Sequence, residues 1–143
     1  MITSGELLRG FGNAAGEVGH IVLVAGGRQC RCGNRGCLEA YAGGWAIAER
    51  AQEAVRADPE AGRALVALAG DVGRISAMEV AGAFRRGDPL ANRLVRETAD
   101  YLAAGLTGIV NAFNPRVLIL GGGAGMIGAA TLAREVLVAG GTQ

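Results

Sequence analysis

The sequence predicts an α/β domain in which helices outnumber strands, and three patterns indicate it. Apolar residues recur at spacings of three and four across much of 38–109, which is the periodicity of amphipathic helices. Branched aliphatic residues form a short run at 20–25, and a wholly apolar run at 117–120, which follows Arg116, is typical of a central parallel strand buried on both faces. Two strands make a small sheet for so many helices, so we expect 1–143 to be a single partial domain of a longer protein.

The overall composition is that of a globular chain. Its 143 residues are enough for one sizeable core, 50% of them are apolar, and the formal net charge is +1. A charge so close to zero lacks the basic footprint of a nucleic-acid-binding protein. The first residues lack the order of a secretory leader, and no apolar run is long enough to span a bilayer. We therefore expect a cytoplasmic protein with no membrane partner and no nucleic-acid partner.

The N-terminal part is predicted to be mostly irregular. Residues 1–19 are rich in glycine and are expected to form loops, and the strand at 20–25 should end at the glycine pair that follows it. Gly33 and Gly36 lie within 30–37, where they suit tight turns.

Helices are predicted from the next segment onward. The first begins near Cys37 and is interrupted at Gly43 and Gly44, which split it in two, and its second half should stop before Pro59. A short helix follows over 60–70. Two aromatic residues at helical spacing are expected in the core, Tyr41 and Trp45.

Two further helices have clear start signals. Ser76 is a candidate N-cap with Glu79 three residues later, which makes a capping box, and this helix should end at Gly87. Asp88 is the candidate cap of the next helix, with Pro89 in its first turn. A single apolar face extends that helix to about Asn111.

The C-terminal part combines a strand with a run of glycines. The strand at 116–120 leads directly into Gly121, Gly122 and Gly123, and a further helix is expected over 131–141. Backbone N–H groups after such a strand can face a phosphate or a ribose. The run is neither a P-loop nor a complete dinucleotide fingerprint, and a plain turn between strand and helix is equally compatible with it.

The single histidine and all three cysteines fall within eighteen residues, as His20, Cys30, Cys32 and Cys37. One imidazole and three thiolates match a closed, tetrahedral, structural zinc site, because a catalytic zinc would keep an open position and an iron–sulfur cluster usually takes four cysteines. The alternative is a set of unrelated residues in which the cysteines are small buried hydrophobes. No packing rule asks for three sulfurs within eight residues, so we expect a zinc knuckle over 30–37 and reduced thiols.

Two acids flank this cluster. Glu17 lies three residues before His20, and Glu39 lies two residues after Cys37. A lone glutamate is usually a solvated surface charge. Each of these acids, however, is held in place beside a metal ligand, and a carboxylate can accept two hydroxyl hydrogen bonds at once. The pair is therefore a candidate site for a sugar or another polyol.

Taken together, these segments resemble the ROK family of repressors, open reading frames and sugar kinases. The matching stretches are GNAAGEVGH at 12–20, CRCGNRGCLEAYAGG at 30–44, the segment 85–115, and VLILGGG at 117–123. The resemblance implies an actin-like, ribonuclease-H-like ATPase fold whose two lobes close on a sugar and ATP. The implied site residues are His20, Cys30, Cys32 and Cys37 for zinc, Glu17, His20 and Glu39 for the sugar, and Gly121, Gly122 and Gly123 for the nucleotide.

The sequence departs from the family pattern in the part that carries out catalysis. The family's catalytic base is the aspartate of an Asn-Asp pair, and neither that pair nor a D-x-G-G-T phosphate loop occurs here. The resemblance therefore implies the C-terminal lobe of a ROK-type sugar kinase without its N-terminal lobe, which cannot transfer a phosphoryl group by itself.

The complete protein would be an ATP-dependent hexose kinase of the glucokinase type, using magnesium and ATP, with this chain as its sugar-binding zinc lobe. The alternative is the sugar-sensing domain of a ROK-type transcriptional repressor, because the same lobe serves both. A zinc module with no ligand is a third possibility. Family members are commonly homo-oligomers, and we expect the same here.

Overall fold

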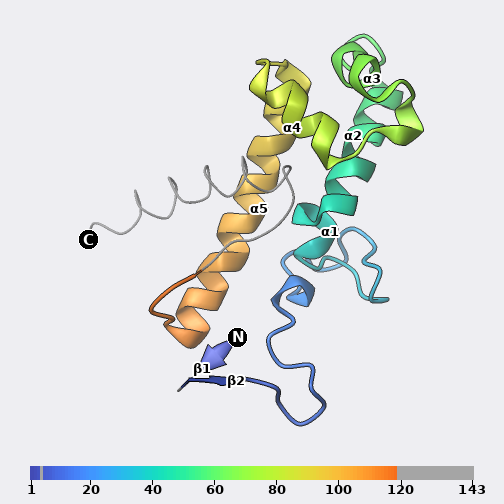
Figure 1. Cartoon of the computed structure of the whole chain (residues 1–143). Helices are drawn as coiled ribbons and strands as arrows, with labels where there is room; N and C mark the ends of the chain where they lie inside the picture. Colours follow the sequence, from blue (N-terminus) through green and yellow to red (C-terminus); the bar gives the residue numbers. More distant parts are fainter. Residues whose placement is uncertain (4, 119–143) are drawn as a thin grey trace.

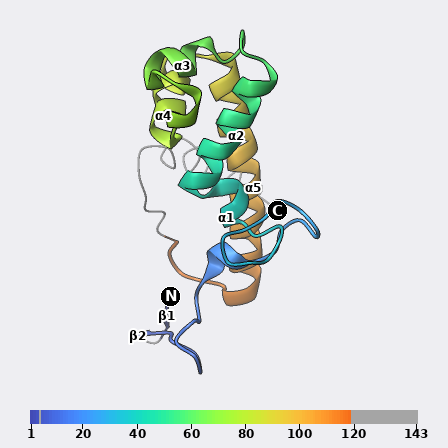
Figure 2. The same cartoon turned by 90° about the vertical axis from the view of Figure 1, so that its right-hand side faces the viewer.

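Two long helices lie side by side and form the body of the molecule (Figure 1, Figure 2). The computed structural model describes residues 1–3 and 5–118 of the chain. Two shorter helices cover one end of the long pair, and a one-turn helix extends it toward the other end. The helices, in chain order, are α1 (Glu39–Ala42), α2 (Gly44–Ala57), α3 (Arg63–Ala69), α4 (Ala77–Arg85) and α5 (Pro89–Phe113).

The boundaries of α4 and α5 confirm the start signals in the sequence. At α4, the Ser76 hydroxyl accepts the backbone N–H of Met78 at 3.1 Å, and the Glu79 carboxylate accepts the backbone N–H of Ser76 at 2.9 Å. At α5, Asp88 accepts the backbone N–H of Ala91 at 2.8 Å. These bonds satisfy N–H groups that the first turn of a helix leaves without partners. The helix α5 ends at Phe113, two residues beyond the predicted end.

The predicted interruption at the glycine pair is also confirmed. Gly43 has an extended backbone (φ −67°, ψ 149°) and separates α1 from α2. The helix α2 ends at Ala57, before Asp58, as expected from the proline that follows.

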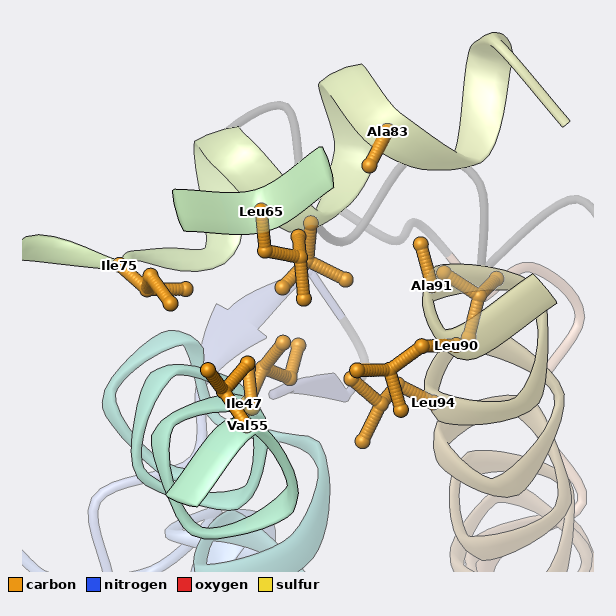
Figure 3. Packing of buried hydrophobic residues seen from close by; sticks show 11 residues of the cluster. Ile47, Val55, Leu65, Ile75, Ala83, Leu90, Ala91 and Leu94 are labelled. Carbon is orange, nitrogen blue, oxygen red and sulfur yellow. The ribbon is translucent and has the colours of Figure 1, made fainter. Parts of the chain in front are cut away.

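The larger core lies where α2, α3, α4 and α5 meet. Figure 3 shows apolar side chains from all four helices and from the loop before α4 pointing toward one another. Leu65 and Ile75 are almost completely buried. The helix α3 is too short to be stable by itself, so burial of these side chains stabilises both α3 and the loop before α4. The labelled members are Ile47, Val55, Leu65, Ile75, Ala83, Leu90, Ala91 and Leu94.

A smaller core lies under α1, against the C-terminal half of α5. Leu38 and Ala42 pack there against Leu102, Leu106 and Ile109. A third cluster joins it and contains Cys30, Cys37, Ala40 and Tyr41, with Trp45 and Tyr101 half-buried beside them. The two ends of the cysteine-containing loop are therefore packed beside α1 and α5, whereas residues 31–35 between them are exposed.

The predicted strand at 20–25 is wrong. His20 ends a short 3₁₀ helix, η1 (Val18–His20), and Val22 forms only an isolated bridge with Cys37. The backbone N–H groups of Leu23 and Val24 both donate to the carbonyl of Gly36, so this segment bonds to the cysteine loop instead of to a second strand. Its aliphatic side chains are largely exposed, whereas those of a central strand are buried on both faces of the sheet.

The sheet in the described residues is a small antiparallel hairpin. It consists of β1 (Ile2–Thr3) and β2 (Glu6–Leu7), in a segment that was expected to be loop. A second 3₁₀ helix, η2 (Val72–Arg74), precedes α4. The α/β class is thus confirmed only in part, because the described residues are mainly helical.

The predicted C-terminal elements fall largely outside the described residues. Residues 116–118, at the start of the expected strand, are described and are not in a strand, whereas 119–143 are not described. The glycines at 121–123 and the expected helix at 131–141 therefore stay predictions. No helix within the described ranges is long and apolar enough to cross a membrane.

Candidate metal centre and its neighbouring acids

Backbone hydrogen bonds shape the loop that carries the three cysteines, which we call the knuckle (residues 30–37). The N–H of Cys30 donates to the carbonyl of Asn34 at 2.8 Å, and the N–H of Gly33 donates to that of Cys30 at 3.1 Å. The side-chain amide of Gln29 donates to three carbonyls of the same loop, those of Cys30, Gly33 and Asn34, at 3.1–3.2 Å. These bonds turn the chain so that its cysteines face the end of η1.

The four predicted metal ligands come together. Their ligand atoms all lie within 4.8 Å of one another. Cys30 Sγ is 3.8 Å from His20 Nδ1, and Cys32 Sγ is 3.7 Å from Cys37 Sγ. A zinc–sulfur bond of about 2.3 Å places tetrahedral sulfurs about 3.8 Å apart, so the observed spacing fits a zinc ion held by these residues.

The three thiols of the cluster differ in burial and in how readily they lose their protons. Cys30 and Cys37 are buried, and Cys32 is exposed. Burial, followed by the neighbouring Cys32 and Cys30 thiols, raises the pKa of Cys37 to about 12. A hydrogen bond with the backbone of Asn34 lowers the pKa of Cys32. A buried thiol beside other sulfurs loses its proton readily only when a positive ion replaces that proton, and metal binding to cysteines does this.

Glu39 is held directly beside the cluster. It is the first residue of α1, and its Oε2 lies 3.5 Å from Nδ1 of His20. Its other oxygen, Oε1, accepts the indole N–H of Trp45 at 2.9 Å. The bond from Trp45 fixes the carboxylate. Because the Glu39 side chain is about a third exposed, it is still open to a ligand. The structure therefore brings His20 and Glu39 together, as the sequence suggested.

The other predicted ligand-binding residues are placed less closely. Glu17 immediately precedes η1, its side chain is exposed, and it does not cap that helix. It lies three residues from His20 along the chain, but no hydrogen bond among the described residues fixes its carboxylate. The glycines at 121–123 lie outside the described residues, so their role at a nucleotide stays a prediction.

Sequence reasoning missed two residues at this site. Trp45 was expected in the core, but it is only half-buried and donates to Glu39. Arg31, between two of the cysteines, lies with its guanidinium carbon 4.4 Å from the centre of the Trp45 ring. The spacing of these residues gives no periodic signal, because the helix break at Gly43 separates Glu39 from Trp45.

The helices, the knuckle and the adjacent carboxylate define a helical domain with a Cys₃His cluster that could hold a metal, beside a candidate sugar-binding acid. A sequence model of the ROK family matches residues 1–136, and the chain belongs to this family. A glucokinase of Streptomyces coelicolor is 38% identical over 124 residues, which cover 86% of this chain and 39% of that protein. The chain thus spans about two fifths of the length of this curated relative.

Solved structures and regulatory proteins also match. The structure of a ROK family glucokinase from Streptomyces griseus, in complex with glucose and AMPPNP, superposes with a TM-score of 0.84 at 35% identity. The match covers 95% of this chain and 45% of that one. The xylose repressor of Bacillus subtilis is 32% identical over 120 residues, covering 84% of this chain and 27% of that protein. Both kinases and repressors therefore contain this domain, whose fold is that of the matching part of the glucokinase.

Proposed function

We propose that this chain is the sugar- and zinc-binding lobe of an ATP-dependent hexose kinase of the glucokinase type. The observation that carries the proposal is the position of the Glu39 carboxylate, whose Oε2 lies 3.5 Å from Nδ1 of His20 and whose side chain is about a third exposed. A fixed, partly exposed carboxylate next to an imidazole offers the acceptor and donor groups that neighbouring sugar hydroxyls require. The similarity to glucokinases supports a hexose as the ligand.

In this proposal each residue of the site has one task. His20, Cys30, Cys32 and Cys37 hold a zinc ion, which with four protein ligands supplies structural rigidity and leaves no open position for catalysis. His20 turns Nδ1 toward the cluster, and in this proposal its other nitrogen contacts a sugar hydroxyl. Glu39, and Glu17 from the preceding loop, accept further hydroxyl hydrogen bonds. Together they orient one hydroxyl for phosphoryl transfer, which depends mainly on positioning.

The remaining parts of the reaction lie outside this site. We propose that Gly121, Gly122 and Gly123 contact ATP, and that magnesium neutralises its phosphates. The sequence contains no Asn-Asp pair to supply the catalytic aspartate, so the chain by itself should bind ligands without transferring phosphate. A homo-oligomer and a cytoplasmic location remain predictions.

A second function is favoured by one observation, the similarity to the xylose repressor. In that case the same acids would bind a sugar as a signal. The two functions differ in nucleotide binding, because a repressor has no phosphoryl donor to hold.

The test is a calorimetric titration of the zinc-loaded chain with glucose, with xylose, and with magnesium and AMPPNP. The kinase proposal expects glucose to bind more tightly than xylose and expects AMPPNP to bind as well. Preference for xylose without AMPPNP binding would favour the repressor. Glu39→Ala should abolish sugar binding, whereas Glu60→Gln, on an exposed side chain beside α3, should not change it. A wild-type chain that binds zinc but neither sugar would contradict both functions.

A further inference from the structure

Among the described residues, one hydrogen-bond donor contacts the Glu39 carboxylate. The indole N–H of Trp45 lies 2.9 Å from Oε1 of Glu39, and it leaves Oε2 facing His20 at 3.5 Å. Trp45 is at the start of α2 and Glu39 begins α1, so the bond spans the break between the two helices. The orientation of this carboxylate therefore depends on where the indole ring is placed.

The break between the helices makes room for this bond. A Cβ atom on Gly43 would lie 2.9 Å from Cγ of Glu39, 2.5 Å from its carbonyl oxygen and 3.3 Å from Nε1 of Trp45. These distances are too short for any residue larger than glycine unless its neighbours move. Glycine at position 43 therefore allows Glu39 and Trp45 to come within hydrogen-bonding distance of each other.

The indole ring is in turn covered by the knuckle. The guanidinium carbon of Arg31 lies 4.4 Å from the ring centre, within the range of a cation–π interaction. Arg31 lies between Cys30 and Cys32, so two metal ligands fix its backbone on both sides. The same side chain also lies 3.7 Å from Glu49 of α2, but both partners are exposed, so this ion pair contributes little to the placement of the guanidinium.

We propose that Trp45 is a positioning residue through which the occupied metal knuckle sets the orientation of the Glu39 carboxylate. The proposal rests on the proposed function of Glu39 as a sugar ligand, and it adds how that ligand is controlled. The metal fixes the backbone of Arg31, Arg31 packs on the face of Trp45, and Trp45 donates to Glu39. Metal occupancy and sugar affinity are therefore coupled through a chain of three side chains.

The first test follows the coupling from the metal to Trp45. Because Trp45 is the single tryptophan of the chain, a ¹⁵N-labelled sample gives one indole N–H resonance. Removing zinc with a chelator should shift this resonance in the wild type. In Arg31→Met, which keeps much of the side-chain length but lacks the guanidinium, the resonance should shift less than half as far. Glu49→Gln is the matched control, because it removes the ion pair of Arg31 and leaves the guanidinium over the ring; it should behave like the wild type.

The second test follows the coupling from Trp45 to the sugar. Trp45→Phe keeps an aromatic ring for Arg31 and removes only the N–H donor, so glucose should bind about three- to tenfold more weakly while zinc stoichiometry is unchanged. Tyr101→Phe is the control, since it removes one polar group from a neighbouring aromatic residue of the same cluster. It should leave both affinities as in the wild type.

The outcomes separate this proposal from the proposed function. An indole resonance that does not respond to zinc, or a Trp45→Phe chain that binds glucose as tightly as the wild type, overturns the positioning role. Loss of zinc together with glucose in Trp45→Phe also overturns it, because that result indicates a merely structural residue. A wild-type chain that binds zinc but no hexose overturns the proposed function, and the zinc response of the indole then still decides whether the knuckle controls Trp45.

Discussion

Gly36 shows how strongly the knuckle depends on single backbone positions. Its φ of +82° lies in the left-handed region, and a Cβ atom there would be 1.7 Å from the carbonyl oxygen of Val24. Its own carbonyl accepts the N–H groups of Leu23 and Val24, and its N–H donates to Arg28. Because the obstacle is backbone rather than a flexible side chain, no rotamer change can relieve it. Only glycine fits between the second and third cysteine at this point.

We therefore expect Gly36→Ala to prevent metal binding. The knuckle would have to open to accommodate the methyl group, which would separate Cys37 from Cys32, and the zinc content measured by mass spectrometry should fall to near zero. Gly33→Ala is the matched control: Gly33 also has a positive φ, but a Cβ atom there meets nothing within 4 Å. It should cost about 1 kcal/mol in stability and retain zinc. Equal zinc loss in both variants would show that backbone strain, rather than the contact with Val24, is responsible.

Cys32 offers a direct test of the link between metal and sugar. It is exposed, so Cys32→Ser removes a ligand without disturbing the core. We expect zinc affinity to fall by more than about tenfold and glucose affinity to fall with it, because Glu39 and His20 lose their common support. Titration of both ligands on the same preparation measures this. Loss of zinc with unchanged glucose affinity would show that the two sites are independent.

The proximity of the four candidate ligands was predictable from their spacing, but the surroundings of the cluster were not. Three cysteines and a histidine in a chain that has no others are a chemical signal that does not depend on the details of the fold. The contact of Trp45 with Glu39 depends instead on the angle between α1 and α2, which the glycine pair at 43–44 permits but does not specify. Sequence periodicity therefore assigned Trp45 to the core.

Among the secondary-structure elements, helices were predicted better than strands for a physical reason. The starts of α4 and α5 depend on local hydrogen bonds from Ser76, Glu79 and Asp88, which the sequence displays directly. The segment 20–25 has the composition of a strand, but a strand also needs a partner. Its partner here is the knuckle, which offers a single bridge. The aliphatic run can be read from the sequence, but which backbone segment lies next to it in the fold cannot.

The capping box of α4 should make stability depend on pH. The hydroxyl and backbone N–H of Ser76 lower the pKa of Glu79 in the folded chain. Its stabilising effect is therefore complete above the unfolded pKa of about 4.3 and is lost as the pH falls through the lower, folded value. We expect Glu79→Gln to lower the free energy of unfolding by about 0.5–1 kcal/mol at pH 7 and by almost nothing at pH 3, as measured by urea titration.

An exposed glutamate provides the control for this prediction. Glu60 forms only a surface ion pair with Arg63, and both side chains are 76% exposed. Glu60→Gln should change stability by less than about 0.5 kcal/mol at either pH. If the difference between Glu79→Gln and the wild type persists unchanged at pH 3, the carboxylate charge is not the source of the stabilisation.

At the scale of the whole described structure, a buried charge connects α1, which lies beside the knuckle, to the two long helices. Arg50 of α2 is only 8% exposed. It donates at 2.9 Å to the carbonyl of Tyr41 in α1 and to the hydroxyl of Thr98 in α5, and it pairs with Glu97 at 2.5 Å. Three helices therefore share one guanidinium, and the knuckle rests on the α1 end of this junction.

We expect Arg50→Met to destabilise the chain by about 2–3 kcal/mol. The methionine fills much of the same volume but leaves the Tyr41 carbonyl without its donor in a buried position. Arg93→Met is the control, because Arg93 is exposed and lies 3.9 Å from the same Glu97. It should change the urea midpoint very little. Equal effects of the two substitutions would assign the stabilisation to the charge of Glu97 rather than to the buried junction.

The hydrogen bonds that Gln29 donates to Cys30, Gly33 and Asn34 also bear on how readily the knuckle would take up an ion. A loop that is shaped by its own amide and carbonyl groups pays little ordering entropy when a metal arrives. Residues that are not themselves ligands should therefore contribute to the affinity of the knuckle for a cation.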